Sequence, residues 1–321
     1  MAVRLLYRFL SGIVVLFLIT LLSFALAELA PGSYLAEMEL NPAIPPETLE
    51  VLRTRYDLDQ GLAERYGAWL GSLFRGELGY SLAYGMPVGE LLRPRLLNTL
   101  LLAGVAQVVL WALALTWGTW TAWRPGGWAD RTAAVAGGLL LALPEILLAL
   151  LALMAAARSG FFPVGGMRSL DWAELSWVGR VLDLLSHLAL PVLVLVLAGL
   201  PMLLRHVHAA VSETLDQPYI RAARAYGCPP GRLLLRHALP AAAQPLVALF
   251  GLSVARLLSG SLLVEVIFGW PGLGPLLIEA ILARDLYVVI GATLVSAVLV
   301  VLSQALTNVF QERLDPRLRS A

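Results

Sequence analysis

The side chains that most often carry chemistry are few in this chain of 321 residues. It has four histidines and a single cysteine, Cys228, so an internal disulfide and a cysteine metal cluster are excluded. On a helix, His206 and His208 would point to different faces, which disfavours a shared metal ion. His187 is expected to be hydrated, at the outer edge of a membrane span. Neither Gly-x-Ser-x-Gly nor His-Glu-x-x-His occurs, so an intramembrane enzyme is disfavoured and no metal site is predicted.

The basic residues exclude a second class of chemistry. All 23 are arginine, and the chain has no lysine. A phosphate-binding P-loop needs its lysine to reach the β- and γ-phosphates, so this chain cannot hold a Walker A motif. Lysine Schiff-base chemistry is excluded for the same reason. If a nucleotide drives this protein, another chain must bind it, and no cofactor is expected here. The net charge of +1 also excludes a strongly basic nucleic-acid-binding protein.

The composition places these residues in a membrane. Hydrophobic residues make up 59% of the chain and charged residues 14%, with a mean hydropathy of +0.78, whereas soluble domains hold roughly 45–50% and 25%. A bilayer core takes about 20 apolar residues in a helix. We therefore predict an all-α integral membrane protein with six transmembrane helices, in windows 10–29, 96–120, 133–157, 188–204, 245–267 and 288–310. The first window is longer than the roughly 7–15 apolar residues of a signal peptide, which favours an uncleaved helix.

Three regions follow from this pattern: an N-terminal transmembrane helix (1–30), an extracytoplasmic helical insertion (31–95) and a five-helix core (96–321). Within the insertion, the spacing of apolar residues predicts helices near 47–56 and 62–74. With the N-terminus inside the cell, the cytoplasmic segments hold twelve arginines and the two short external loops hold four. Because positive charge favours the cytoplasmic side, both termini are predicted to be cytoplasmic.

Residues 212–240 form a cytoplasmic segment with a pattern of its own. Pro218 fits the first turn of a helix, the alanines that follow favour helix, and Gly227 ends it. This predicts a helix of about two turns, rimmed by Arg221 and Arg224, with a second helix after Gly231. The segment is either a basic loop attracted to anionic lipid or a rigid knob that docks into a partner chain, and the residue types alone leave both open.

The same segment resembles the EAA loop of ABC importer permeases. The matching residues are Arg221-Ala222-Ala223, Gly227 and, after nine further residues, His237-Ala238-Leu239-Pro240. Arg221 stands where the family pattern has Glu, and His237 where it has Ile; both departures are typical of the peptide/nickel branch. Segments 58–60 with 69–81, 265–274 with 284–285, and 314–317 resemble the same branch at matching places in the topology. The whole chain thus resembles the first, B-type permease subunit of the dipeptide/oligopeptide/nickel family.

The resemblance implies a type I ABC importer permease fold in the cytoplasmic membrane of a bacterium or archaeon. It also implies a second homologous permease subunit, two ATPase subunits that bind ATP and Mg, and an extracytoplasmic solute-binding protein. The implied substrate is a short peptide, with nickel or another metal chelate as the alternative. A secondary transporter is disfavoured because no internal repeat is visible. The residues expected to contact the ATPases are Tyr219, Arg221, Ala222, Ala223, Arg224, Gly227, Leu239 and Pro240.

Two further groups of residues are candidates for the external loop and for the pathway. Helix-breaking residues predict an external turn or a re-entrant segment at Trp270, Pro271, Gly272 and Gly274. Glu145 and Arg256 fall inside predicted spans, where a charge costs at least ~2.5–3.5 kcal/mol, so each should face protein or water. They form either a structural pair or part of the pathway wall. Ser303 and Gln304 on the last span face either the pathway or a neighbouring helix.

Overall fold

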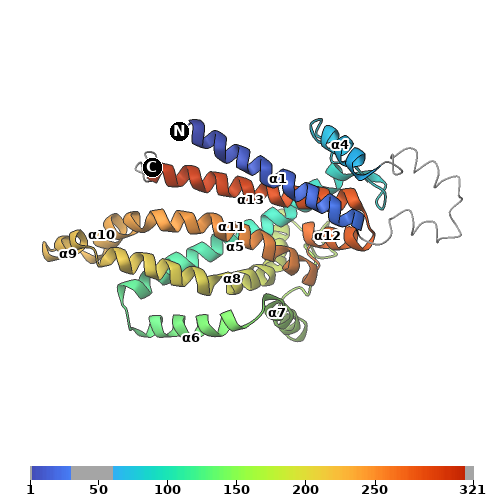
Figure 1. Ribbon diagram of the computed structural model, residues 1–321. Helices are drawn as coiled ribbons and strands as arrows, with labels where there is room; N and C mark the ends of the chain where they lie inside the picture. The colour runs from blue at the N-terminus through green and yellow to red at the C-terminus, as the bar shows by residue number, and fades with distance from the viewer. Residues whose placement is uncertain (1, 30–60, 315–321) are drawn as a thin grey trace, which may run out of the picture. The chain divides into compact units, whose positions relative to one another are not determined.

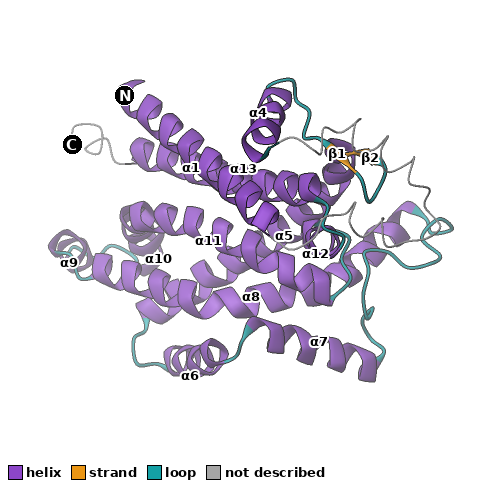
Figure 2. Cartoon of the chain, turned by 45° about the vertical axis from the view of Figure 1, so that its right-hand side comes forward, coloured by secondary structure: helices purple, strands orange, loops and turns teal. Residues whose placement is uncertain are grey.

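The computed structural model describes residues 2–29 and 61–314. Within these ranges most of the backbone is helical, as Figure 1 and Figure 2 show, and the predicted all-α class is confirmed. Two compact units can be distinguished: residues 1–98 with 271–301, and residues 99–270 with 302–321. The elements in chain order are α1 (Ala2–Leu29), α4 (Leu62–Leu73), β1 (Tyr80–Ser81), β2 (Met86–Pro87), α5 (Val88–Trp123), α6 (Trp128–Ala142), α7 (Glu145–Ser159), α8 (Trp177–Leu215), α9 (Pro218–Ala225), α10 (Pro230–Leu233), a π-helical turn (Leu234–Ala238), α11 (Leu239–Ile267), α12 (Leu273–Leu282) and α13 (Leu286–Leu314).

Aromatic side chains hold the first unit together. Tyr66 and Trp69 of α4 pack in one core with Phe24 of α1 and Ile290 of α13. The Tyr66 ring meets Phe24 edge-on with 5.3 Å between centroids, and its hydroxyl lies 2.9 Å from Thr20 Oγ1. α4 confirms the helix predicted near 62–74, whereas the helix predicted near 47–56 lies outside the described residues.

A small hairpin of β1 and β2 is tied to the start of α13 by Asp285. This residue is buried, with 3% of its surface exposed, and its carboxylate accepts from Ser81 Oγ at 2.6 Å and from Ala83 N at 3.0 Å. It also accepts from Val288 N at 3.4 Å, which caps the N-terminus of α13. One buried carboxylate therefore joins two segments that are 204 residues apart in the chain.

α8 is the central helix of the second unit. Its buried face includes Val194, Leu195 and Val196, each at most 2% exposed, and it packs against α6, α7 and α11. α5 approaches it closely at Gly118, where a Cβ would lie 2.8 Å from Val207 Cγ1. Two prolines lie inside α8 without ending it, as expected for a helix whose neighbours satisfy the freed backbone groups.

The predicted span 133–157 is wrong as a single helix. α6 ends at Ala142, α7 begins at Glu145, and the chain bends by 99° between them. Leu143 and Pro144 are extended, with ψ of 124° and 143°, because proline disfavours helical backbone in the residue before it and has no N–H for the ladder. In the described part of the chain, four helices are long and apolar enough to cross a membrane, or five if the bent pair is one span. The count of six stays a prediction.

Candidate functional site

α9 is a short helix that a single buried side chain anchors to the second unit. Gln217 is extended before Pro218, and its carbonyl accepts from the backbone N–H groups of Ile220 and Arg221. The Ile220 side chain is fully buried in the core around α8. Figure 1 and Figure 2 both place α9 beside α10 at one end of this unit. The predicted two-turn helix is thereby confirmed.

The remaining side chains of α9 form an open surface. The Arg224 guanidinium lies 5.2 Å from the centre of the Trp123 ring at the end of α5, a cation–π distance that holds this side of the helix. Ala223 is half-buried. The exposed residues of the helix and its C-terminal end include Tyr219, Arg221, Ala222, Arg224, Tyr226 and Gly227. Small side chains beside an exposed tyrosine allow another chain to pack closely.

Gly227 ends α9 in the left-handed conformation, with φ of +80°. Its N–H donates to Arg224 O at 3.0 Å, and Cys228 N donates to Ala223 O at 3.1 Å. These two bonds are the usual way in which a glycine closes the last helical turn and redirects the chain. The glycine was predicted to stop the helix, and the structure confirms that role.

The chain returns from α9 through α10 and the π-helical turn into α11. Pro240 has no N–H to donate to the carbonyl of Arg236, so the α-helical ladder is interrupted there, and the preceding turn is π-helical. Leu239 is half-buried and Pro240 is exposed. These two predicted coupling residues therefore lie at the start of α11 and not on α9.

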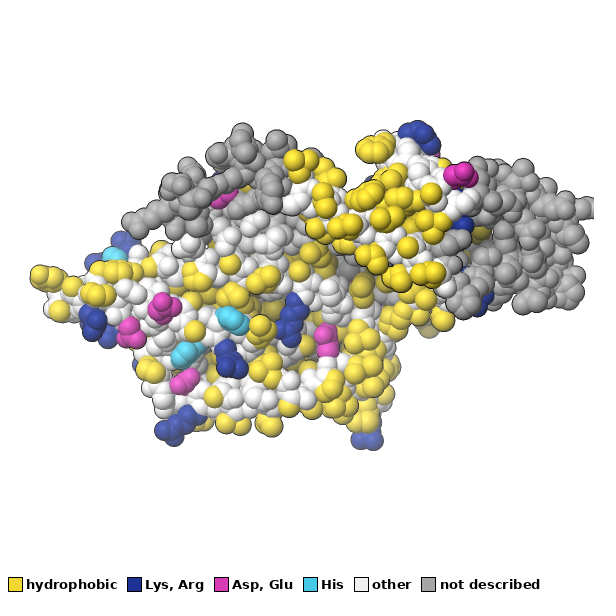
Figure 3. All heavy atoms as spheres, in the orientation of Figure 1, with side chains coloured by type: hydrophobic (Ala, Val, Ile, Leu, Met, Phe, Trp, Pro, Cys, Tyr) yellow, Lys and Arg dark blue, Asp and Glu magenta, His cyan; other side chains and the backbone are white. Residues whose placement is uncertain are grey.

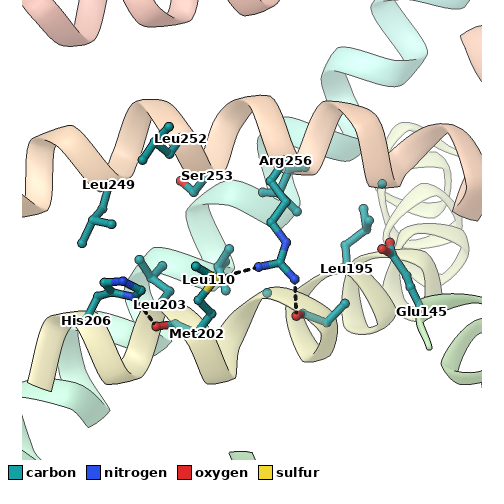
Figure 4. A pocket seen from close by; sticks show the side chains of 14 residues that line it. Leu110, Glu145, Leu195, Met202, Leu203, His206, Leu249, Leu252, Ser253 and Arg256 are labelled. Carbon is teal, nitrogen blue, oxygen red and sulfur yellow. Dashed lines mark hydrogen bonds between the residues drawn. The ribbon is translucent and has the colours of Figure 1, made fainter. Parts of the chain in front are cut away.

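Glu145 and Arg256 line one pocket of about 100 Å³ in the second unit, between α5, α7, α8 and α11 (Figure 4). Arg256 extends from α11 to α8, where its guanidinium donates to Ala198 O at 3.4 Å and lies 3.1 Å from Met202 Sδ. Glu145 is the first residue of α7, and its carboxylate lies against Gly260 of α11. Within the described residues, Glu145 Oε1 is buried and has no hydrogen-bond partner. The two charges thus share a pocket without forming an ion pair.

Ser303 and Gln304 do not line this pocket. Ser303 lines a separate apolar groove between α5, α11 and the end of α13, and Gln304 is exposed. One turn further along, Thr307 is buried and packs directly against Gly251 of α11. The polar side of α13 therefore serves helix packing at Thr307.

The four external-loop candidates lie in a tight turn that leads from α11 into the short apolar helix α12. Gly269 has φ of +59°, and Trp270 N donates to Glu265 O at 2.8 Å, which closes the end of α11. The Trp270 side chain is fully buried, and Pro271 O accepts from Asn98 Nδ2 at 2.8 Å. Among the candidates, the two glycines Gly272 and Gly274 are also buried. Their place outside the membrane stays a prediction.

Three of the four histidines lie in different surroundings. His206 is exposed and lines the Glu145–Arg256 pocket, whereas His208 Nδ1 lies 2.9 Å from Thr121 Oγ1. Figure 3 shows charged and histidine side chains gathered on one face of the second unit, over α8. The expectation of a wet His187 is wrong: the residue is 6% exposed, and its Nδ1 lies 2.8 Å from the carbonyl of Asp183 one turn earlier. A backbone carbonyl supplies the polar partner that water was expected to supply.

The sequence pointed to the charges in the pocket but not to the groups around them. Gly260 lies four residues after Arg256, so its place on the same helix face was a usable signal. Met202 and Ala198 contact Arg256 across 54 and 58 residues of chain. No local pattern links them to it.

The second unit consists of long apolar helices with a short exposed helix in the loop between α8 and α11, the arrangement expected for the membrane subunit of an ABC importer. Residues 114–320 match the family described as binding-protein-dependent transport system inner membrane component, and residues 1–102 match the N-terminal part described for such membrane components. The chain belongs to this family. It is a multi-pass inner-membrane subunit of a transporter and not an enzyme.

Relatives match over nearly the whole chain. It is 34% identical to the oligopeptide transport system permease protein AppB of Bacillus subtilis (strain 168), over 99% of both chains. It is 33% identical to the oligopeptide transport system permease protein OppB of Mycobacterium bovis, over 97% of both chains. A solved structure of the MetNI methionine ABC transporter in inward-facing conformations aligns with a TM-score of 0.56 at 19% identity, covering 70% of this chain and 96% of that one. The predicted type I permease fold is confirmed.

Proposed function

We propose that this chain is one of two membrane subunits of an ATP-driven, binding-protein-dependent importer of short peptides. Relatives that match it from end to end carry names of peptide and oligopeptide permeases. The second membrane subunit is a similar permease chain, and the pathway runs between the two. A solute-binding protein delivers the peptide from outside the cytoplasm.

The exposed helix α9 is the observation that carries this proposal. Ile220 and the Arg224–Trp123 contact fix α9 to the second unit, while Tyr219 and Ala222 point outward to a partner. That partner is an ATPase subunit, which holds the ATP and Mg that a chain without lysine cannot bind in a P-loop. Closure of the ATPases moves α9, and the helices on either side of its loop, α8 and α11, transmit the movement as rigid bodies.

The proposal is tested by reconstituting this chain in liposomes with its ATPases, second permease and binding protein. We expect uptake of radiolabelled di- to pentapeptides that depends on ATP and on the binding protein. A complex whose ATPases lack their Walker A lysine is the matched control and should take up nothing. Uptake of nickel without uptake of any peptide would replace the peptide with a metal chelate as substrate.

Both termini and α9 are proposed to lie in the cytoplasm, and Cys228 tests this directly. It is the single thiol of the chain and is half-buried beside α9. We expect a membrane-impermeant maleimide to leave Cys228 unlabelled in spheroplasts and to label it in inverted vesicles from cells without the ATPases.

A reciprocal variant controls for the accessibility of the thiol. Leu170 is fully exposed in the loop between α7 and α8, which is proposed to be external. In the double variant Cys228→Ser, Leu170→Cys, the labelling pattern should be reversed. Labelling of Cys228 in intact spheroplasts would contradict the orientation.

A further inference from the structure

The Glu145–Arg256 pocket holds two opposite charges among mostly apolar side chains, with His206 and Ser253 as its other polar side chains. Of the fourteen residues that line it, most are aliphatic, and among them are Leu110, Leu195, Leu203, Leu249, Leu252 and Leu257. Charged groups inside a membrane protein carry a large solvation cost, so they are placed there for pairing, for water or for a substrate. A pair that merely locked two helices together would bring the two groups into contact.

Within the described residues, neither group forms a direct ion pair with a side chain of opposite charge. The Arg256 guanidinium has a backbone carbonyl and a thioether sulfur as neighbours, both neutral. Glu145 Oε1 is buried without a hydrogen-bond partner in the described residues. Figure 4 shows the guanidinium directed toward α8 and the Glu145 carboxylate lying apart from it along the same pocket. Each group is therefore positioned in the pocket without a hydrogen-bonded partner of opposite charge.

The two charged residues meet α11 one turn apart. The Glu145 carboxylate lies over Gly260, where a Cβ would come within 2.8 Å of Oε1. Gly260 follows Arg256 by four residues, which is about 6 Å along a helix axis. An extended dipeptide spans about 7 Å between its ends. The points at which the two residues meet α11 are thus about as far apart as the ends of a dipeptide, whose charges are opposite in sign to theirs.

We propose that this pocket binds a zwitterionic dipeptide during its passage, with Arg256 on the C-terminal carboxylate and Glu145 on the N-terminal ammonium. A guanidinium suits a carboxylate because its planar N–H groups can donate two parallel bonds. A longer peptide can place only one of its ends in the pocket at a time, so its uptake should depend less on Arg256 and Glu145 together. This inference rests on the proposed function and names the substrate group that the site recognises.

The test uses the reconstituted complex and four forms of dialanine: free, N-acetylated, C-amidated and blocked at both ends. The binding protein itself discriminates among these forms, and it is the same in every experiment. We therefore measure the ratio of uptake between two forms and compare that ratio between wild type and each variant. Arg256→Gln should lower the uptake ratio of free to C-amidated dialanine at least about tenfold, the loss expected for one charge-assisted hydrogen bond. Glu145→Gln should lower the ratio of free to N-acetylated dialanine in the same way.

Gly260→Ala provides an independent variant, because its Cβ displaces the Glu145 carboxylate without changing any charge. It should act like Glu145→Gln. Gly104→Ala, in α5, is the matched glycine control, because a Cβ there meets nothing within 4 Å. Arg205→Gln controls for the loss of an exposed arginine on α8 that lies outside this pocket. Both controls should keep the wild-type ratios.

The outcomes separate this inference from the proposed function. The inference would be overturned if Arg256→Gln and Glu145→Gln lowered the uptake of all four dialanine forms equally, or if both left the uptake ratios unchanged. Peptide uptake by the wild type would still support the proposed function. A wild-type complex that takes up no peptide would overturn the proposed function and the inference with it. If Gly260→Ala prevents assembly, judged by co-purification of the subunits, the isosteric Glu145→Gln decides the ammonium side alone.

Discussion

Gly227→Val is expected to abolish peptide uptake while the helices of the chain still assemble. Gly227 has φ of +80°, and a β-branched side chain cannot take that conformation without strain of about 1–2 kcal/mol or more. The bonds from Gly227 N and Cys228 N that close α9 would be lost, and α9 would point in another direction. The measurement is ATP hydrolysis stimulated by the loaded binding protein, together with co-purification of the ATPases.

A second glycine in the same loop controls for volume. Added Cβ atoms meet nothing within 4 Å at either Gly227 or Gly231, but only Gly227 of the two has positive φ. Gly227→Ala should therefore weaken coupling, whereas Gly231→Ala should behave as wild type. Normal uptake and normal ATPase binding in Gly227→Val would refute the coupling role of α9.

α9 could be predicted from the sequence because its signals are local. Proline at the first helical position and glycine just past the end act through the backbone within a few residues, and both lie where the pattern placed them. Burial of Ile220 could not be foreseen in the same way. It depends on α9 packing against the core of the second unit.

The break between α6 and α7 could not be predicted from hydropathy. The window 133–157 is apolar throughout, and apolar composition is the same whether the chain runs straight or turns. Pro144 breaks the helix, whereas Pro191 and Pro201 lie inside α8 without ending it. The difference lies in the neighbours, because α8 is the helix against which α6, α7 and α11 pack. Tertiary packing decides which prolines are tolerated.

The two charged residues of the Glu145–Arg256 pocket could be predicted from the sequence, but their arrangement could not. A charged side chain inside an apolar window carries a high solvation cost, which is a sufficient reason to expect a site there. Glu145 and Arg256 could therefore be identified from the sequence without knowledge of any contact. Their arrangement depends on the approach of α7 to α11 at Gly260 and on the reach of Arg256 to α8. Both are contacts between helices distant in the chain. The sequence therefore indicated which residues matter, and the structure indicated how they are spaced.

Asp285→Ala is expected to open the β1–β2 hairpin in the first unit. The substitution removes the cap of α13, which is typically worth about 1 kcal/mol. It also leaves Ser81 Oγ and Ala83 N without their acceptor, at about 1–3 kcal/mol for the buried Ser81 hydroxyl and less for the half-buried Ala83 N–H. The free energy of opening of residues 80–87, measured by hydrogen exchange, should fall by roughly 3 kcal/mol. Asp285→Asn keeps one carbonyl oxygen as an acceptor and should lose less than half of that.

The neighbouring pair of Tyr84 and Glu279 supplies the control for Asp285. Tyr84 donates its hydroxyl to the exposed Glu279 carboxylate at 2.6 Å. Burial, and then this bond, raise the pKa of Tyr84 to about 12. Without Glu279 a tyrosine hydroxyl is still protonated at neutral pH, so it can donate to an amide oxygen. Glu279→Gln should therefore change the opening free energy by no more than about 0.5 kcal/mol. Equal effects of Glu279→Gln and Asp285→Ala would show that the buried carboxylate is not the group that holds the hairpin to α13.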